Sequence, residues 1–250
     1  LDYLAQDFMD HEWSIKYMVR KLVLTHAYQL ASSSDRADFM IDPDDRLCWR
    51  MQTKRLEAEE IRDAMLVASG KMDFTPPVGS PVMELPEQEI RDGAVTGKGK
   101  KFNTDAKGLD DDTTHRSVYL PIIRDMLPPV LEVFDFAEPS MVMGLRDTTT
   151  VPTQALYMLN DPFVLDTSDA MADRLLSQTN ISNLGRVDLA YELTLGRSPS
   201  YFEEHAAMKF LGEYGYAEAY VYKGKTDPRQ QAWAGLCQAL FTSAEFRYLN

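Results

Sequence analysis

The sequence predicts an all-α fold: an irregular multi-helix single domain over residues 1–250, with a long irregular insertion at 73–115 and at most one short extended segment. Apolar residues recur at three- and four-residue steps in several segments, which places them on one face of an α-helix. Residues typical of helix caps flank these segments, and strands do not alternate with helices along the chain. These observations together favour a helical core.

The helix predicted over residues 55–69 is the element around which we expect the others to pack. Its apolar stripe consists of four residues at helical spacing: Ala58, Ile61, Met65 and Ala68. Arg62 falls off this stripe, at pairing distance from Glu59. Gly70 supplies the positive φ that ends a helix, and Lys71 suits the negative end of the helix dipole.

Two helices are predicted before this central element. Residues 1–10 form a short helix that ends near His11. Ser14 caps a second helix, whose apolar stripe is Ile15, Met18, Val19, Leu22 and Val23. The polar stretch 31–38 predicts a loop that leads into the central element.

Residues 72–115 show no helical period. Four prolines punctuate the first half, and Gly, Lys and Asp dominate the second half. We therefore expect the insertion at 73–115 to be irregular and mobile in solution. The segment 116–121, RSVYLP, alternates like a β-strand and predicts an edge strand or an extended segment that Pro121 ends.

The C-terminal half reads as a series of helices separated by turns. Helices are predicted near 122–136, at 152–160, from about 162 to 178, and at 182–195. Within the first of these ranges, Pro128-Pro129 starts or breaks a helix. Ser200 and Glu203 resemble a capping box that opens the next helix and completes an αα-hairpin. Residues 215–227 predict a loop, after which Asp227 and Pro228 open the last helix.

Charge and motifs exclude several classes of function. The formal net charge is −13, which disfavours nucleic acid and anionic lipid as partners. The sequence contains no run of eighteen apolar residues, so we expect no membrane insertion by this segment. The N-terminal residues do not resemble a signal peptide. Because the chain begins without Met and in mid-pattern, we read it as a piece excised from a longer protein.

The sequence motifs and the histidine and cysteine residues predict neither a catalytic site nor a metal site. The sequence contains no Gly-rich phosphate loop, no G-x-S-x-G elbow, no H-E-x-x-H and no C-x-x-C-H, and the four histidines lack zinc-ligand spacing. Cys48 and Cys237 are expected to be free buried thiols in helical, apolar surroundings. A disulfide is the alternative in an exported protein.

The most suggestive polar group combines arginines with carboxylates and an aromatic residue. Its candidate binding residues are Trp49, Arg50, Arg55, Glu57, Arg116 and Arg146. Arginines beside aromatic rings can bind carboxylates, sulfates or sugar rings. Equally, arginines tie the helices of an acidic protein together through partly buried ion pairs. We favour this structural network, and we expect the three tryptophans to be core anchors.

Several long motifs carry a resemblance to a known family. In order, they are DPDDRLCWRMQTKRLEAEEIRD, RSVYLP, FDFAEPSMVMGLRDTTTVPTQALYMLNDPFV, AYELTLGRSPS and WAGLCQALFTSAEFRYL. Together they resemble the planctomycete-type C-terminal domain of unknown function, found in exported proteins that often carry a cytochrome c-like module upstream. The resemblance covers nearly the whole chain and adds Gln154 to the candidate residues. It implies an exported, periplasmic or cell-surface protein, no cofactor in this domain, and haem, if any, in an upstream domain.

The function expected from these observations is an interaction, not a reaction. We predict a non-catalytic domain that docks against upstream domains of its own polypeptide or an envelope protein. Such a domain should expose an apolar face on the order of several hundred Å². The alternative is a glycan- or anionic-ligand-binding or catalytic domain that uses the Arg/carboxylate/Trp group. A second alternative is a docking partner for a cytochrome c-like electron-transfer module, attracted by the acidic surface.

Overall fold

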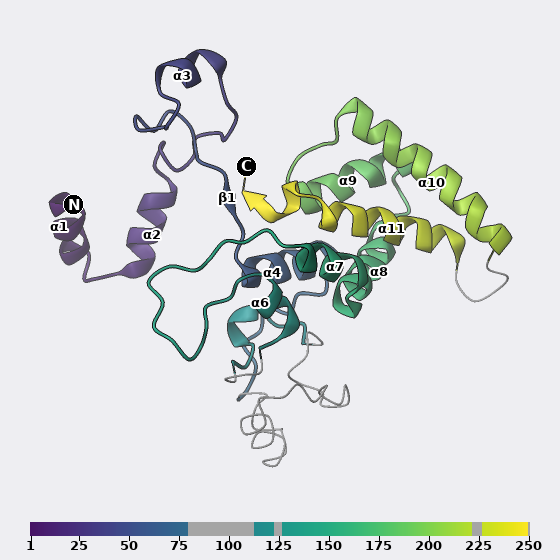
Figure 1. The fold of residues 1–250 in the computed structure, drawn as a ribbon, viewed down its shortest axis with the longest axis horizontal. Helices are drawn as coiled ribbons and strands as arrows, with labels where there is room; N and C mark the ends of the chain where they lie inside the picture. Colours follow the sequence, from purple (N-terminus) through teal and green to yellow (C-terminus); the bar gives the residue numbers. More distant parts are fainter. Residues whose placement is uncertain (80–112, 123–126, 222–226, 250) are drawn as a thin grey trace. The chain divides into compact units, whose positions relative to one another are not determined.

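A computed structural model describes residues 1–79, 113–122, 127–221 and 227–249, and the side chains of 215–221 are not described (Figure 1). The described chain is mostly helical, which confirms the predicted all-α class. It groups into two compact units, Leu1–Arg55 with Tyr248–Asn250 (unit 1) and Leu56–Arg247 (unit 2). The expectation of a single domain stays a prediction.

Unit 1 contains three helices and a two-stranded ribbon: α1 (Asp2–Asp10), α2 (Ile15–Val23), α3 (Arg36–Ile41), β1 (Lys54–Arg55) and β2 (Tyr248–Leu249). The predicted cap of α2 is confirmed, because the Ser14 hydroxyl accepts a hydrogen bond from the Tyr17 amide. β1 pairs antiparallel with β2, with Lys54 opposite Leu249 and Arg55 opposite Tyr248.

The apolar stripe of α2 is not buried in the structure. Neither α1, α2 nor α3 contains a buried residue, although the sequence predicted that apolar stripes would share one interior. In the described part of unit 1, only Asp42 and Asp45 are buried. The amphipathic pattern thus predicts the helix correctly but not its burial, because burial requires a partner surface.

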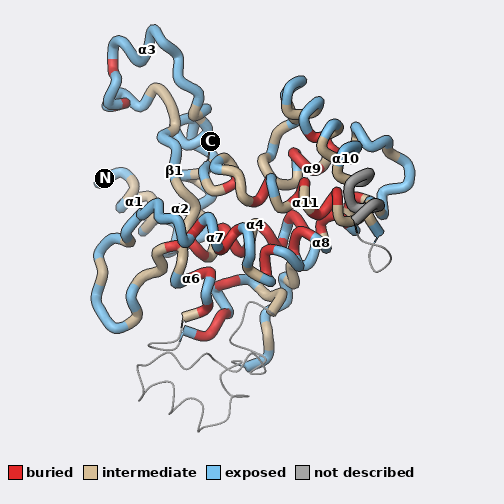
Figure 2. The backbone as a smooth tube through the Cα atoms, turned by 45° about the vertical axis from the view of Figure 1, so that its right-hand side comes forward, coloured by how far each residue is buried: buried red, intermediate tan, exposed pale blue. Residues whose placement is uncertain are grey.

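Unit 2 contains the apolar core. Its elements are α4 (Ala58–Ser69), η2 (Ser117–Tyr119), α6 (Pro129–Val133), α7 (Pro152–Asn160), α8 (Pro162–Leu176), α9 (Asn183–Leu195), α10 (Tyr201–Val221), α11 (Pro228–Thr242) and η3 (Glu245–Arg247). α11 packs against α8 and α10, and α4 packs against α8 and α6. Buried positions accordingly gather along α4, α7, α8 and α11 (Figure 2).

The predicted central helix is confirmed as α4. All four residues of its predicted stripe are buried: Ala58, Ile61, Met65 and Ala68. Glu57 and Glu60 form a reciprocal capping box at its start, and Gly70 ends it in the left-handed conformation with φ of 79°. The local signals read from the sequence therefore decide where this helix begins and ends.

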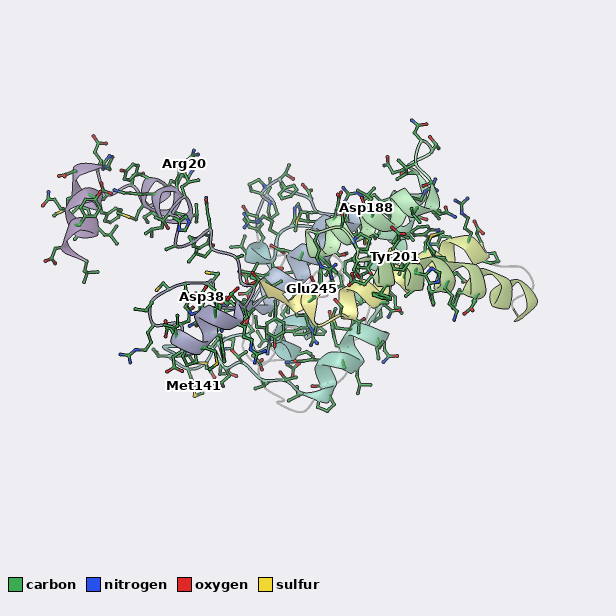
Figure 3. The ribbon with its side chains drawn as sticks, turned by 90° about the horizontal axis from the view of Figure 1, so that it is seen from above. Arg20, Asp38, Met141, Asp188, Tyr201 and Glu245 are labelled. Carbon is green, nitrogen blue, oxygen red and sulfur yellow. The ribbon has the colours of Figure 1, made fainter. Side chains whose placement is uncertain are left out.

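The predicted αα-hairpin is formed by α9 and α10. Gly196 ends α9 with φ of 69°, and the Ser200–Glu203 capping box opens α10. Between them, the Arg197 guanidinium pairs with Glu203 at 2.8 Å and with Glu245 at 2.6 Å. Figure 3 labels Glu245, which lies in η3 after α11. Arg197 therefore connects the hairpin to η3.

Two sequence expectations in unit 2 are wrong. The segment 116–121 is not a strand, because its backbone turns into the 3₁₀-helix η2 while Asp63 Oδ1 accepts from both the Ser117 amide and hydroxyl at 2.7 Å. Residues 215–221 are not a loop, because α10 continues to Val221; a glycine within a helix costs only about 1 kcal/mol.

The expected insertion at 73–115 lies mainly outside the described residues, which include 73–79 and 113–115. These two ends meet, because the Asp73 amide donates to the Thr114 carbonyl at 2.9 Å and Asp73 forms a parallel bridge with His115. In the part of the chain that the structure describes, no helix combines the length and the apolar character that a membrane crossing requires.

Candidate functional site

The seven candidate binding residues divide between the two units. Trp49, Arg50 and Arg55 belong to unit 1, whereas Glu57, Arg116, Arg146 and Gln154 belong to unit 2. Their use in ligand binding stays a prediction.

In unit 1, Trp49 and Arg50 end a loop that two buried aspartates hold. Asp42 Oδ2 accepts from the Leu47 amide at 2.7 Å. Asp45 Oδ1 accepts from the Trp49 amide at 3.0 Å and from the Arg50 amide at 3.4 Å. The carboxylates replace the backbone partners that these amides lack outside a helix or sheet.

The same loop contains two non-glycine residues in the left-handed region. Asp45 has φ of 54° and Cys48 has φ of 53°. The Arg50 guanidinium lies 5.0 Å from the centre of the half-buried Trp49 ring, whose Nε1 donates to the Asp42 carbonyl at 2.9 Å. Cys48 is exposed in this loop, so its predicted burial in a helix is wrong; both cysteines are free.

In unit 2, Arg146 binds two carboxylates at the start of α4, those of Glu59 and of the N-cap residue Glu57. Its guanidinium makes two hydrogen bonds to Glu59, at 2.7 and 2.9 Å, and lies 3.0 Å from Glu57. It also lies 4.8 Å from the centre of the Phe136 ring. The hydrogen bonds to Glu59 raise the pKa of Arg146 above its ordinary value. This arrangement fits the structural network that the sequence favoured, because the cation is already neutralised.

Gln154 and Arg116 also have partners within unit 2. Gln154 is buried, and its amide nitrogen donates to the carbonyls of Val133 and Thr149 at 3.1 and 3.2 Å. The Arg116 side chain is half exposed, with Nε 3.9 Å from Asp63 Oδ2. Gln154 therefore joins α7 to the segment before it and to the end of α6.

Sequence reasoning missed the role of Arg62, whose side chain is fully buried. Its guanidinium donates to the His115 carbonyl at 3.0 Å, to the Ser117 hydroxyl at 3.3 Å and to the Thr113 carbonyl, and lies against the Phe163 ring. Arg62 follows Ala58 by four residues, which puts it at the edge of the buried stripe. That spacing is the signal that could have revealed it.

The N-terminal part of unit 1 is the α1–α2 hairpin, which consists of the two helices and the turn 11–14 between them. Its polar side is held by internal contacts: Lys21 Nζ lies 2.8 Å from both Asp7 Oδ2 and the Tyr3 hydroxyl. The hydrogen bond from Lys21 lowers the pKa of Asp7. The rings of His11 and Tyr17 stack with centres 3.7 Å apart. The hairpin is thus ordered by its own side chains.

The opposite side of α2 is apolar and open. Ile15 is 71% exposed, Val19 52% and Leu22 42%. These residues follow one another at four- and three-residue steps, so they form one stripe along the helix. Trp13, in the turn between the helices, is also largely exposed and is not the core anchor that the sequence predicted; Trp233 is buried.

The described residues contain no group of three or more His, Cys, Asp or Glu side chains placed to hold a metal ion. A family model described as PSD1, protein of unknown function (DUF1553), matches residues 1–211. No curated protein and no solved structure matches the chain significantly. Since the family model covers most of the chain, the protein belongs to the PSD1 (DUF1553) family of proteins of unknown function.

Proposed function

We propose that this protein is a non-catalytic interaction module of an exported, multidomain polypeptide. It docks through the apolar stripe of α2, formed by Ile15, Val19 and Leu22, into an apolar groove on another domain of the same polypeptide. The observation that carries the proposal is the exposure of this stripe on a helix without a single buried residue.

The spacing of the stripe supports a helix-in-groove contact. Anchors at positions i, i+4 and i+7 are how an amphipathic helix fills an apolar groove. Lys21 is tied to Asp7 and Tyr3, so the hairpin is preorganised and loses little side-chain entropy on docking. The apolar face is thus prepared for contact before a partner arrives.

The small size of the stripe supports a partner within the same polypeptide. Three apolar side chains cannot supply the roughly 1,000 Å² that a specific complex between separate proteins usually buries. A covalent connection raises the effective concentration of the partner, so a small contact is sufficient. The long motifs resemble domains of exported proteins that carry a cytochrome c-like module upstream. This resemblance supports both an upstream domain as the partner and export of the protein.

Cysteine labelling of the intact polypeptide tests this docking. In a Cys48→Ser background, Val19→Cys reports on the stripe, and Lys16→Cys reports on an exposed position of the same helix. We expect the thiol at position 19 to react about tenfold more slowly in the intact polypeptide than in residues 1–250 alone. The thiol at position 16 should react equally fast in both.

Equal labelling of position 19 in both forms would refute the proposal. Protection that disappears at about 1 M NaCl would instead favour the second alternative, electrostatic docking of a cytochrome c-like module to the acidic surface, because salt screens exposed charges. Protection by apolar burial should survive this change.

A further inference from the structure

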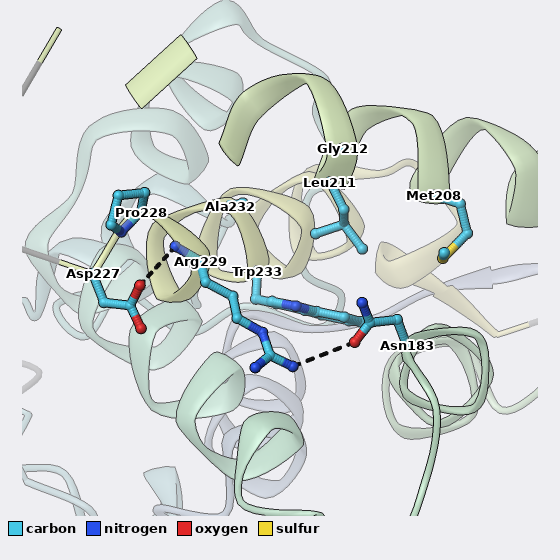
Figure 4. A pocket seen from close by; sticks show the side chains of 9 residues that line it. All are labelled: Asn183, Met208, Leu211, Gly212, Asp227, Pro228, Arg229, Ala232 and Trp233. Carbon is cyan, nitrogen blue, oxygen red and sulfur yellow. Dashed lines mark hydrogen bonds between the residues drawn. The ribbon is translucent and has the colours of Figure 1, made fainter. Parts of the chain in front are cut away.

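A pocket in unit 2 lies between the start of α9, the middle of α10 and the start of α11 (Figure 4). Its volume is about 460 Å³, within the range of small-molecule sites. The buried Trp233 of α11 and Met208 and Leu211 of α10 are among its lining residues. The pocket therefore offers an aromatic ring and two aliphatic side chains to an apolar ligand.

One end of this pocket is polar and contains Asn183, Asp227 and Arg229. Arg229 Nη2 lies 3.4 Å from Asn183 Oδ1, and Arg186 Nη1 donates to the same oxygen at 3.0 Å (the Arg229 contact is dashed in Figure 4). Both guanidinium groups thus use the oxygen of the Asn183 amide. Asn183 and Arg229 are exposed, and in the part of the chain that the structure describes Asn183 Nδ2 and Nε and Nη1 of Arg229 donate to no protein acceptor.

These unused donors suit a carboxylate. A guanidinium presents parallel N–H groups that match the two carboxylate oxygens, and the Asn183 amide adds another donor beside it. Asp227 also lines the pocket, where its carboxylate caps α11 by accepting from the Arg229 amide at 3.0 Å. Of the residues that line the pocket, Arg229 is positive and Asp227 is negative. Because Asp227 caps α11, the Arg229 guanidinium is the charged group that can pair with an anion.

We propose that this pocket binds a small monocarboxylate with an aromatic or aliphatic body. The carboxylate lies at Arg229 and Asn183, and the body lies over Trp233 between Met208 and Leu211. This small-molecule site is independent of the docking of α2, since all of its residues lie in unit 2. Its failure would leave the proposed interaction function untouched.

The tryptophans provide a direct readout of binding to the ¹⁵N-labelled protein. The ¹H–¹⁵N NMR spectrum should contain three indole N–H signals, from Trp13, Trp49 and Trp233. Substituting each tryptophan in turn assigns its signal. We expect 2-naphthoate to shift the Trp233 signal saturably and to leave the other two in place. The uncharged 2-naphthalenemethanol should bind about tenfold more weakly, because it cannot pair with Arg229.

Two variants separate the polar and apolar parts of the site. Arg229→Gln should weaken 2-naphthoate about tenfold, whereas Arg36→Gln, at an exposed arginine of unit 1, should not change its affinity. Gly212→Leu should abolish binding, because a Cβ at Gly212 points into open space beside the pocket. Leucine also favours a helix over glycine, so this variant should keep its fold.

Three results would overturn the proposal. They are an unshifted Trp233 signal at about 10 mM 2-naphthoate, equal affinity in the Arg229→Gln variant, and unchanged binding in a folded Gly212→Leu variant. Equal weakening by Arg36→Gln and Arg229→Gln would also overturn it, because the anion would then respond only to net charge.

Discussion

Units 1 and 2 contain helices with similar sequence signals but opposite environments. In unit 2, the stripe of α4 is buried, and α8, α6, α9 and η2 pack against this helix. In unit 1, the stripe of α2 is exposed, and the described buried residues are the aspartates of the loop before Trp49. Unit 2 is therefore held by apolar burial, and the loop of unit 1 by side-chain hydrogen bonds to its own backbone.

This difference teaches that an amphipathic helix need not be part of a core. The stripe of α4 finds partners within its own unit, whereas the stripe of α2 remains available for another surface. A free apolar face on an ordered element is typical of an interaction site. The comparison can be tested with matched substitutions in the two units.

The largest effect is expected when isoleucine is shortened in each unit. Ile61→Ala should lower the free energy of unfolding by about 2–5 kcal/mol, because it leaves a cavity in the core. Ile15→Ala should change it by less than about 0.5 kcal/mol, because Ile15 is largely exposed. Urea unfolding measures both. Equal costs would show that the α2 stripe is buried in solution.

The next largest effect is expected at the buried cation of unit 2. Arg62→Met should cost about 3 kcal/mol, because it leaves the carbonyls of Thr113 and His115 and the Ser117 hydroxyl without this donor. Arg116→Met, at a half-exposed arginine, should cost less than about 1 kcal/mol. Urea unfolding checks both variants, and equal costs would contradict a bracing role for Arg62.

A smaller, local effect is expected in the loop of unit 1. Asp45→Ala removes the acceptor of the Trp49 and Arg50 amides and puts alanine at a positive φ. The free energy of local opening of this loop should therefore fall by about 1–2 kcal/mol. Asp45→Asn keeps an oxygen acceptor and tolerates this φ, so it should cost less. Hydrogen exchange at these amides measures the effect. Faster exchange at Val164 of unit 2 would mean that the units open together.

The smallest effect concerns the pH dependence of unit 2. The hydrogen bond from Arg197 lowers the pKa of Glu203 from its ordinary 4.5 to about 2. The unfolded state then binds more protons between these values, so this stabilisation is present above pH 4.5 and lost as the pH falls toward 2.

The Glu203→Gln variant should therefore lose stability less steeply over this range than the unsubstituted protein. Glu213→Gln, at an exposed glutamate of the same helix, should follow the unsubstituted protein. Urea unfolding at a series of pH values measures the slopes. Identical slopes for all three proteins would show that the Arg197–Glu203 pair does not contribute.

Much of the fold could be predicted because local chemistry decides helix ends. Gly70 and Gly196 end α4 and α9, and Asp227 with Pro228 begins α11, as the sequence indicated. The candidate site was less predictable. Arg146 was recognised as a polar residue in need of a partner, but its pairing with Glu59, 87 positions earlier, depends on how distant segments meet.

By itself, the sequence determined the helical class, most helix boundaries and the left-handed glycines that end two helices. These features depend on dihedral preferences, caps and periodicity within a few residues. Only the tertiary structure decided that Arg62 is buried, that the α2 stripe is open, and that a pocket lies over Trp233. Burial depends on whether a complementary surface lies within reach, and one stretch of sequence does not contain that surface.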